Sequence, residues 1–278
     1  LRFNSETGKP EIYAKSRGWK TEASSDSSAA YITTDLVVDL DAGNPNSYSG
    51  SGNTWTDLKG NTNYTWQNKT GSPTYNSGGW IDSGGDGAWL GDSPFPYLSG
   101  IDYTLDIWFK YNSYPHSNWL GNGSLGYVFG LTSDEPETDT FQLHIEDHSR
   151  YNFYFADNEI SLMGAGPGMS YRTTKIGQMY GFGSVFDWYN VVIVSKTDVD
   201  NNLLFYVNGV ERTPSHYGSE GGLQKNVTRF ATLGGLTSSD GNLTEHDASI
   251  ASFRVYDKQL SATEIADNFN NTKSRFGL

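Results

Sequence analysis

Carboxylates are the first candidates for chemistry in this sequence, because two of them held about 5–5.5 Å apart can cleave a glycosidic bond. The densest acidic run is Glu135-Pro136-Glu137-Thr138-Asp139. Pro136 lacks the backbone donor that a central strand requires, so we interpret this run as a loop. The tetrapeptide Ile145–His148 has no second carboxylate at the offset that a catalytic pair needs. We therefore predict no catalytic residue and no enzymatic activity.

Calcium binding is a second kind of chemistry, and it needs about six to eight oxygen ligands. Acidic residues gather in three loop-like stretches: Asp82, Asp86 and Asp92; Asp134, Glu135 and Glu137; Asp240, Glu245 and Asp247. None has a fixed ligand spacing such as that of the EF-hand loop, and solvated turns in an acidic chain have the same composition. The candidate ion is Ca²⁺, and the candidate ligands are Asp82, Asp86, Asp134 and Glu135.

Aromatic rings on loops indicate a third kind of chemistry, because the C–H face of a sugar stacks on a ring while polar neighbours bind its hydroxyl groups. Two segments have this composition, and their candidate carbohydrate-binding residues are Tyr114, His116, Asn118, Trp119, Asn122, His216 and Tyr217. The alternative interpretation is that these rings close the edges of a sheet or line a contact between subunits.

Composition excludes several functional classes. The 278 residues carry a formal net charge of −13, so DNA or RNA would be repelled over most of the surface. The chain has no cysteine, which excludes disulfides and thiolate zinc sites. It has no apolar run of about 18 residues, so we expect no membrane partner.

The elements that must position these residues are mainly β-strands. Apolar and polar residues alternate over Tyr103–Tyr111, Phe141–Ile145 and Tyr151–Phe155, which is the period of a strand with one buried face. The run Trp188–Ser195 is apolar at successive positions, which predicts a central strand covered on both faces. Asn208-Gly209 follows the next predicted strand, Leu203–Val207, and is a strong two-residue hairpin signal.

One helix is predicted after the last strand, Ile250–Tyr256. Ser261 and Glu264 have the spacing of a capping box, and Ile265 and Phe269 then share a helix face. Many strands followed by a single helix predict an all-β, antiparallel two-sheet sandwich. We expect residues 1–34 to form an N-terminal hairpin arm and linker, and residues 35–278 to form the sandwich.

Three stretches of the predicted sandwich resemble a known family. They are Asp35–Gly60, then Trp188–Val194 with the "YVNG" hairpin of Leu203–Arg212, and finally Ile250–Phe269. In this order they resemble laminin-G-like domains of the concanavalin A-like lectin/glucanase superfamily, as found in structural proteins of tailed bacteriophages. The resemblance implies a jelly roll. Glycosidases of this fold carry a Glu-x-Asp-x-x-Glu run, and the spacing within Glu135–Asp139 departs from it.

The first residues resemble a second phage element. Leu1–Lys20 is similar to a short "RFN-turn-EIY-turn-W" segment of fibre and other virion proteins, where it serves assembly or trimer contact. This resemblance implies a homo-oligomer, with a trimer favoured, and other virion proteins as partners.

Three functions follow as hypotheses. The first is a non-enzymatic virion structural protein, such as a fibre, appendage or capsid decoration, that lies on the particle surface and adheres to cell-surface glycans. The second is a secreted bacterial carbohydrate-binding module that depends on calcium. The third is an unusual glycoside hydrolase.

Overall fold

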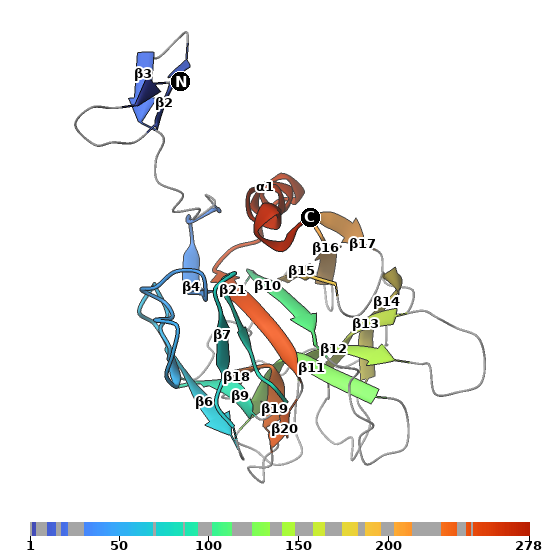
Figure 1. The fold of residues 1–278 in the computed structure, drawn as a ribbon. Helices are drawn as coiled ribbons and strands as arrows, with labels where there is room; N and C mark the ends of the chain where they lie inside the picture. The colour runs from blue at the N-terminus through green and yellow to red at the C-terminus, as the bar shows by residue number, and fades with distance from the viewer. Residues whose placement is uncertain are drawn as a thin grey trace. The chain divides into compact units, whose positions relative to one another are not determined.

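The computed structural model describes residues 2–3, 10–14, 18–21, 31–68, 71–85, 87–93, 102–112, 124–133, 141–147, 158–164, 174–182, 187–195, 203–212, 229–237, 243–245 and 247–278. The chain divides into two compact units, Leu1–Ala30 and Tyr31–Leu278. Figure 1 shows the fold of the chain. The predicted boundary between an arm ending at residue 34 and a sandwich beginning at residue 35 stays a prediction.

The first unit contains a small antiparallel sheet. Its strands lie in the order β1 (Arg2–Phe3), β2 (Pro10–Ala14) and β3 (Gly18–Thr21). The predicted N-terminal hairpin is confirmed by the pairing of β1 with β2. Strand β3 extends the hairpin and was not predicted, because the pattern around Trp19 has no alternation.

The second unit is a sandwich of two antiparallel sheets, which confirms the predicted fold class. Among the described residues each sheet has eight strands. Sheet I has the order β17-β16-β15-β10-β21-β8-β7, and β4 also pairs with β21. Its strands are β4 (Leu36–Asp41), β7 (Thr74–Asn76), β8 (Trp80–Asp82), β10 (Tyr103–Tyr111), β15 (Tyr189–Ser195), β16 (Leu203–Val207), β17 (Val210–Arg212) and β21 (Ala248–Tyr256).

Sheet II has the order β14-β13-β12-β11-β18-β9-β6-β5. Its strands are β5 (Thr54–Trp55), β6 (Tyr64–Asn68), β9 (Gly87–Gly91), β11 (Ser124–Ser133), β12 (Phe141–Asp147), β13 (Asn158–Gly164), β14 (Thr174–Phe182) and β18 (Arg229–Leu233). A separate pair is formed by β19 (Gly235–Thr237) and β20 (Leu243–Glu245).

The core fills the space between the two sheets. Leu105, Ile107 and Phe109 point inward from β10, and Trp55 and Trp89 contribute large rings from sheet II. The rings of Trp55 and Trp89 are 5.5 Å apart in an edge-to-face arrangement, which aromatic pairs favour. Burial of these inward rings and aliphatic side chains is the main cohesive term of the fold.

The predicted strands are present wherever the structure describes them, but β10 is buried on both faces, whereas its alternation predicted one buried face. The segments Tyr103–Tyr111, Phe141–Ile145, Leu203–Val207 and Ile250–Tyr256 all lie in strands, whereas Tyr151–Phe155 lies outside the described residues. In β15, Val191 and Ile193 face the core and Val192 and Val194 pack on the opposite face, as expected for a strand covered on both sides.

The predicted turn and helix are also confirmed. Asn208 and Gly209 both have positive φ angles, 52° and 75°, as a tight hairpin turn requires. Helix α1 (Ala262–Thr272) begins with the capping box of Ser261 and Glu264, and the 3-10 helix η2 (Lys273–Phe276) follows it. Residues of α1 and η2 pack on the outer face of sheet I. Among the described helices, none is long and apolar enough to cross a membrane.

Candidate functional site

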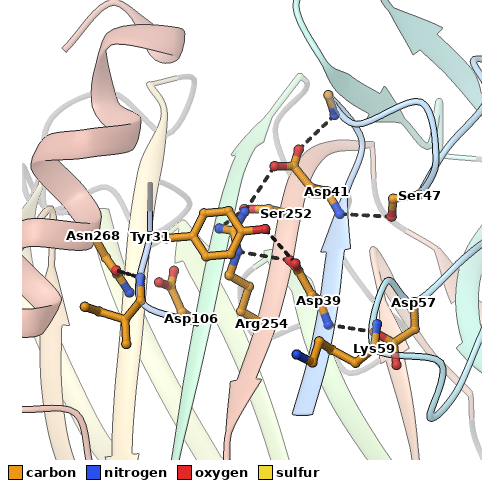
Figure 2. A network of polar contacts seen from close by, with 12 residues as sticks. Tyr31, Asp39, Asp41, Ser47, Asp57, Lys59, Asp106, Ser252, Arg254 and Asn268 are labelled. Carbon is orange, nitrogen blue, oxygen red and sulfur yellow. Dashed lines mark hydrogen bonds and ion pairs between the residues drawn. The ribbon is translucent and has the colours of Figure 1, made fainter. Parts of the chain in front are cut away.

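A buried group of charges lies on the outer face of sheet I (Figure 2). Successive side chains of β4 alternate between the two faces of sheet I. Val38 and Leu40 enter the core, and Asp39 and Asp41 point to the outer face. Arg254 of β21 lies opposite Asp39 in the strand register. Its guanidinium donates to Asp39 Oδ1 and to Asp41 Oδ2, at 3.1 Å in each case.

Both carboxylates are therefore bound to cations away from bulk water. The side chains of Arg254 and Asp39 are only 2% and 5% exposed. Asp41 has a second partner, Arg275 of η2, at 2.7 Å. Burial alone would raise the pKa of Asp41, but Arg254 and Arg275 together hold it below its ordinary value. Burial raises the pKa of Asp39, against the opposing effect of Arg254. Both carboxylates are occupied by arginines, which suits cohesion rather than acid–base catalysis.

The segment that enters the sandwich covers this group. The ring of Tyr31 lies 3.7 Å from the Arg254 guanidinium carbon, and its hydroxyl donates to Asp39 Oδ2 at 2.6 Å. Burial raises the pKa of Tyr31 to about 12, against the opposing effect of Arg254. The next residue, Ile32, donates its amide to Asn268 Oδ1 of α1 at 2.8 Å. Residues 31 and 32 are therefore attached to β4, β21 and α1 together.

A third buried carboxyl, that of Asp106 on β10, lies beside this group (Figure 2). Burial raises its pKa, against the opposing effect of Arg254. Asn190 Nδ2 donates to Asp106 Oδ1 at 2.6 Å. Asn268 Nδ2 donates to the Tyr256 hydroxyl at 3.1 Å, so a polar layer attaches helix α1 to the sheet.

The side-chain carboxylate of Asp57 binds backbone amides of β4 and of the loop that follows Trp55. Its oxygens accept the amides of Asp39, Lys59, Asn61 and Thr62, at 2.8, 3.0, 2.9 and 3.3 Å. Four backbone donors satisfy a buried carboxylate without a metal ion. This contact joins the loop after Trp55 to strand β4.

The open polar site of sheet I lies at one end of β8, β10 and β21 and contains the predicted metal ligand Asp82. Ser249 Oγ donates to Asp82 Oδ1 and is 2.9 Å from Asn112 Oδ1. Asn112 Nδ2 donates to Asp247 Oδ1 at 3.2 Å. Asp82 and Asp247, which belong to different acidic stretches of the sequence, are thus connected through two polar side chains. Within the described ranges no group of three or more histidine, aspartate or glutamate residues forms a metal site.

The other predicted site residues cannot be placed. Asp86, Asp134 and Glu135 lie outside the described residues, as do the carbohydrate-binding candidates Tyr114, His116, Asn118, Trp119, Asn122, His216 and Tyr217. The acidic run Glu135–Asp139 also lies outside them, whereas Ile145–Asp147 is part of strand β12.

The sequence interpretation missed the Asp39–Arg254–Asp41 group. A signal was present, because Asp39 and Asp41 occupy alternate positions of an otherwise apolar strand and Arg254 interrupts another. Charges at such positions are rarely buried unless they are paired. The pairing itself joins residues 215 positions apart, so the local pattern does not predict it.

Comparison with known proteins gives the family relationship. The family model Laminin_G_3, described as the concanavalin A-like lectin/glucanases superfamily, matches residues 82–266. A search of the curated proteins found no match.

Solved structures show the same fold at low identity. Trypanosoma rangeli sialidase matches with a TM-score of 0.58 and 15% identity over 88% of this chain, which spans 34% of the sialidase. Domain 4 of AbnA, a GH43 extracellular arabinanase from Geobacillus stearothermophilus, in complex with arabinotriose, matches with a TM-score of 0.55 and 14% identity. That match covers 84% of this chain and 98% of the domain. The receptor-binding domain of a botulinum neurotoxin C/D mosaic matches at 0.52 and 11% identity, covering 86% of this chain and 51% of that one.

Proposed function

This chain belongs to the concanavalin A-like lectin/glucanases superfamily, and on that premise we propose that it binds carbohydrate without cleaving it, as a surface-displayed structural protein of a tailed-bacteriophage virion. The sandwich provides adhesion to glycans on the host cell. The N-terminal unit attaches it to copies of itself and to other virion proteins.

Carbohydrate binding is supported by the relatives of this fold. The domain of AbnA that this chain covers almost completely was solved in complex with arabinotriose. It is a separate domain of similar size, which makes it a closer architectural parallel than the sialidase, of which this chain spans about one third.

The observation that carries the non-hydrolytic assignment is the state of the buried carboxylates. Asp39 and Asp41 are bound to Arg254, and Asp41 also to Arg275. A hydrolytic pair needs one protonated and one ionised carboxyl group facing the same glycosidic bond. Asp39 and Asp41 bind arginines under Tyr31 instead, so their oxygens do not face a bond that could be cleaved.

The virion assignment is supported by the first unit. The segments that resemble a phage assembly element, around Arg2, Glu11 and Trp19, fall in β1, β2 and β3. Such a small sheet buries little surface of its own, so contact with other chains would complete it.

The binding test uses isothermal titration of the full chain with arabinotriose and a panel of neutral and acidic oligosaccharides, with a hydrolysis assay on the same panel. We expect saturable binding and no release of product. Trp119→Ala tests whether the predicted loop aromatics take part, and Lys59→Met is the control at an exposed position. Turnover of any saccharide, abolished by Glu135→Gln or Glu146→Gln, would replace the proposal with a glycoside hydrolase.

The assembly test compares the full chain with a variant that lacks residues 1–30, using light scattering. We expect a homo-oligomer, with a trimer favoured, that becomes a monomer on deletion. A full-length monomer contradicts the assembly role and leaves the binding role intact.

A secreted, calcium-dependent binding module is the second candidate, favoured by the connection between Asp82 and Asp247 through Ser249 and Asn112. It predicts a melting temperature that rises with CaCl₂ alone and falls after EDTA treatment, because a ligand that binds only the native state stabilises it. If this second candidate is correct, Asp82→Asn abolishes the response to calcium. If CaCl₂ leaves the melting temperature of the natural protein unchanged, the second candidate is eliminated.

A further inference from the structure

Two tryptophans and a lysine meet at one end of sheet I, next to the polar site at Asp82. Lys110 of β10 lies opposite Ser249 of β21, which lies opposite Asp82 of β8. Trp188 immediately precedes β15, the neighbour of β10 on its other side. The rings of Trp80 and Trp188 are 5.2 Å apart at an angle of 65°, and Lys110 Nζ lies 5.5 Å from each ring centroid. We call this surface the Trp80–Lys110–Trp188 face.

The two rings differ from the tryptophans of the core. Trp55, Trp89 and Trp108 are among the largest fully buried side chains, whereas Trp80 and Trp188 remain partly exposed. Burial of an indole ring stabilises the fold most when water is excluded from both faces of the ring. Partial exposure of two adjacent tryptophans leaves aromatic surface available to a ligand.

The rings are also held in place before any ligand arrives. Trp188 packs on Phe276 of η2 at 4.7 Å between centroids, and Phe276 stacks on Trp108 at 4.1 Å. The Trp80 ring lies against the backbone of Gly78, where a Cβ atom would come within 2.1 Å of it. A preorganised aromatic surface loses little conformational entropy on binding.

Polar groups surround the rings. Among the described residues, no hydrogen bond or ion pair engages Lys110 Nζ, which keeps its three donors for a ligand. Asp82 Oδ1 accepts from the Ser249 hydroxyl, Asn112 Oδ1 lies 2.9 Å from the same hydroxyl oxygen, and both side chains retain further acceptor capacity. Aromatic faces with both donors and acceptors beside them match the alternating C–H and hydroxyl surfaces of a sugar.

We propose that the Trp80–Lys110–Trp188 face, with Asp82 and Asn112, is a carbohydrate-binding site for neutral saccharides. This assignment rests on the proposed glycan-binding function and gives it a location and a ligand class. The sugar stacks on an indole ring, Lys110 donates to its hydroxyl oxygens, and Asp82 and Asn112 accept from its hydroxyl groups. Acidic sugars are disfavoured, because Asp82, Asp187 and Asp247 share this end of the sheet and the chain carries a net charge of −13.

The test titrates the full chain by calorimetry with arabinotriose, galactotriose and trigalacturonic acid. Trigalacturonic acid carries carboxylates that galactotriose lacks. We expect the neutral sugars to bind more tightly than trigalacturonate. Trp80→Ala and Trp188→Ala should each weaken binding by about tenfold, since an aromatic stacking contact has about that value. Lys110→Met should weaken it by a smaller factor, and Lys59→Met is the matched control.

Circular dichroism establishes that each variant is folded. If Trp188→Ala unfolds because it loses contact with Phe276, then Trp80→Ala, Lys110→Met and Asn112→Ala carry the test. Binding that is unchanged in these variants but lost in Trp119→Ala overturns this location and leaves the proposed function standing. Tighter binding of trigalacturonate than of galactotriose overturns the neutral ligand class. A chain that binds none of the saccharides overturns the proposed function as well.

Discussion

Arg254 binds the carboxylates of two buried acidic residues that lie close to each other on β4. The two contacts with Asp39 and Asp41 are buried, so salt screens them little. Desolvation opposes such pairs, and their net contribution relative to an apolar replacement is small. Removing one partner has a different effect, because an uncompensated charge then stays buried.

Arg254→Met should therefore lower the free energy of unfolding by about 3–5 kcal/mol. Urea denaturation followed by circular dichroism measures this loss. The matched control is Arg275→Met, which removes an arginine from the same Asp41 carboxylate at a side chain that is 23% exposed. There we expect a loss of about 1 kcal/mol or less, as for other partly solvated pairs. Equal losses in the two variants would contradict the buried-charge account.

Asp106 gives a pH dependence of opposite sign to that of Asp41. Burial raises the pKa of Asp106 in the folded state, whereas an aspartate in the unfolded chain has a pKa of about 3.9. Its stabilising contribution is present below that pH and is lost as the pH rises through the folded-state pKa. Asp106→Asn removes this loss.

The stability of Asp106→Asn relative to the natural protein should thus increase with pH above about 4, by up to about 1.4 kcal/mol per pH unit. Urea denaturation of both proteins between pH 4 and pH 8 tests the trend. Asp267→Asn, which removes a carboxylate at an exposed position of α1, is the control for the change in net charge. A stability difference between Asp106→Asn and the natural protein that does not change with pH would contradict the prediction.

At the scale of elements, helix α1 depends on its first turn. Ser261 Oγ accepts the amide of Glu264 at 3.3 Å, and Glu264 Oε2 accepts the amide of Ser261 at 2.8 Å. Lys258 adds a contact of 2.7 Å to the same glutamate. Hydrogen bonds from Lys258 and from the Ser261 amide lower the pKa of Glu264. The helix covers Tyr256 and Leu260, so its start also determines how sheet I is covered.

Ser261→Ala should lower stability by about 1 kcal/mol, the usual effect of losing an N-cap side chain. Thermal denaturation with Thr263→Ala as the control checks it, since Thr263 is exposed within the helix and alanine is the better helix former. A loss of stability in Thr263→Ala equal to that in Ser261→Ala would count against the capping role.

Local patterns predicted those elements whose signal lies within a few residues. Strand β10 alternates, β15 is apolar on both faces, Asn208-Gly209 requires positive φ, and Ser261 and Glu264 form the cap. Strand β3 has no comparable pattern and was missed, as were β7 and β8 of sheet I, the pair β19 and β20, and the strands of sheet II other than β12.

The candidate site was harder to predict than the elements. Cross-strand register brings Lys110, Ser249 and Asp82 together from three strands, and no local signal specifies register between strands so far apart in the sequence. The acidic pattern selected Asp82 as a metal ligand, which stays a prediction, and the structure places its carboxylate against Ser249. It did not distinguish the open oxygens near Asp82 from the buried ones of Asp39 and Asp41.

At the scale of the whole molecule, the described residues of the two sheets enclose an apolar core, and the sequence carries an excess of acidic groups. A net charge of −13 repels itself in the compact state. The buried pairs around Arg254 are shielded from added ions, so salt acts mainly on the repulsion between surface carboxylates.

Raising NaCl from about 0.01 M to about 0.15 M shortens the screening length from about 30 Å to about 8 Å. We expect the urea midpoint to rise over this range, because screening relieves repulsion between distant carboxylates. Choline chloride at equal ionic strength is the control for specific sodium binding. A midpoint that falls with either salt would indicate that exposed ion pairs dominate the electrostatics.

The position of Tyr31 determines how the sandwich would respond to mechanical load. Tyr31 is the first residue after the N-terminal unit, and its ring and hydroxyl hold Arg254 and Asp39. Tension along the chain therefore acts first on the side-chain contacts of Tyr31 with Arg254 and Asp39. It reaches the backbone of β4, which begins at Leu36, only after these contacts break. Under force spectroscopy, Tyr31→Ala should extend at lower force than the natural chain, with the later rupture of the sandwich unchanged.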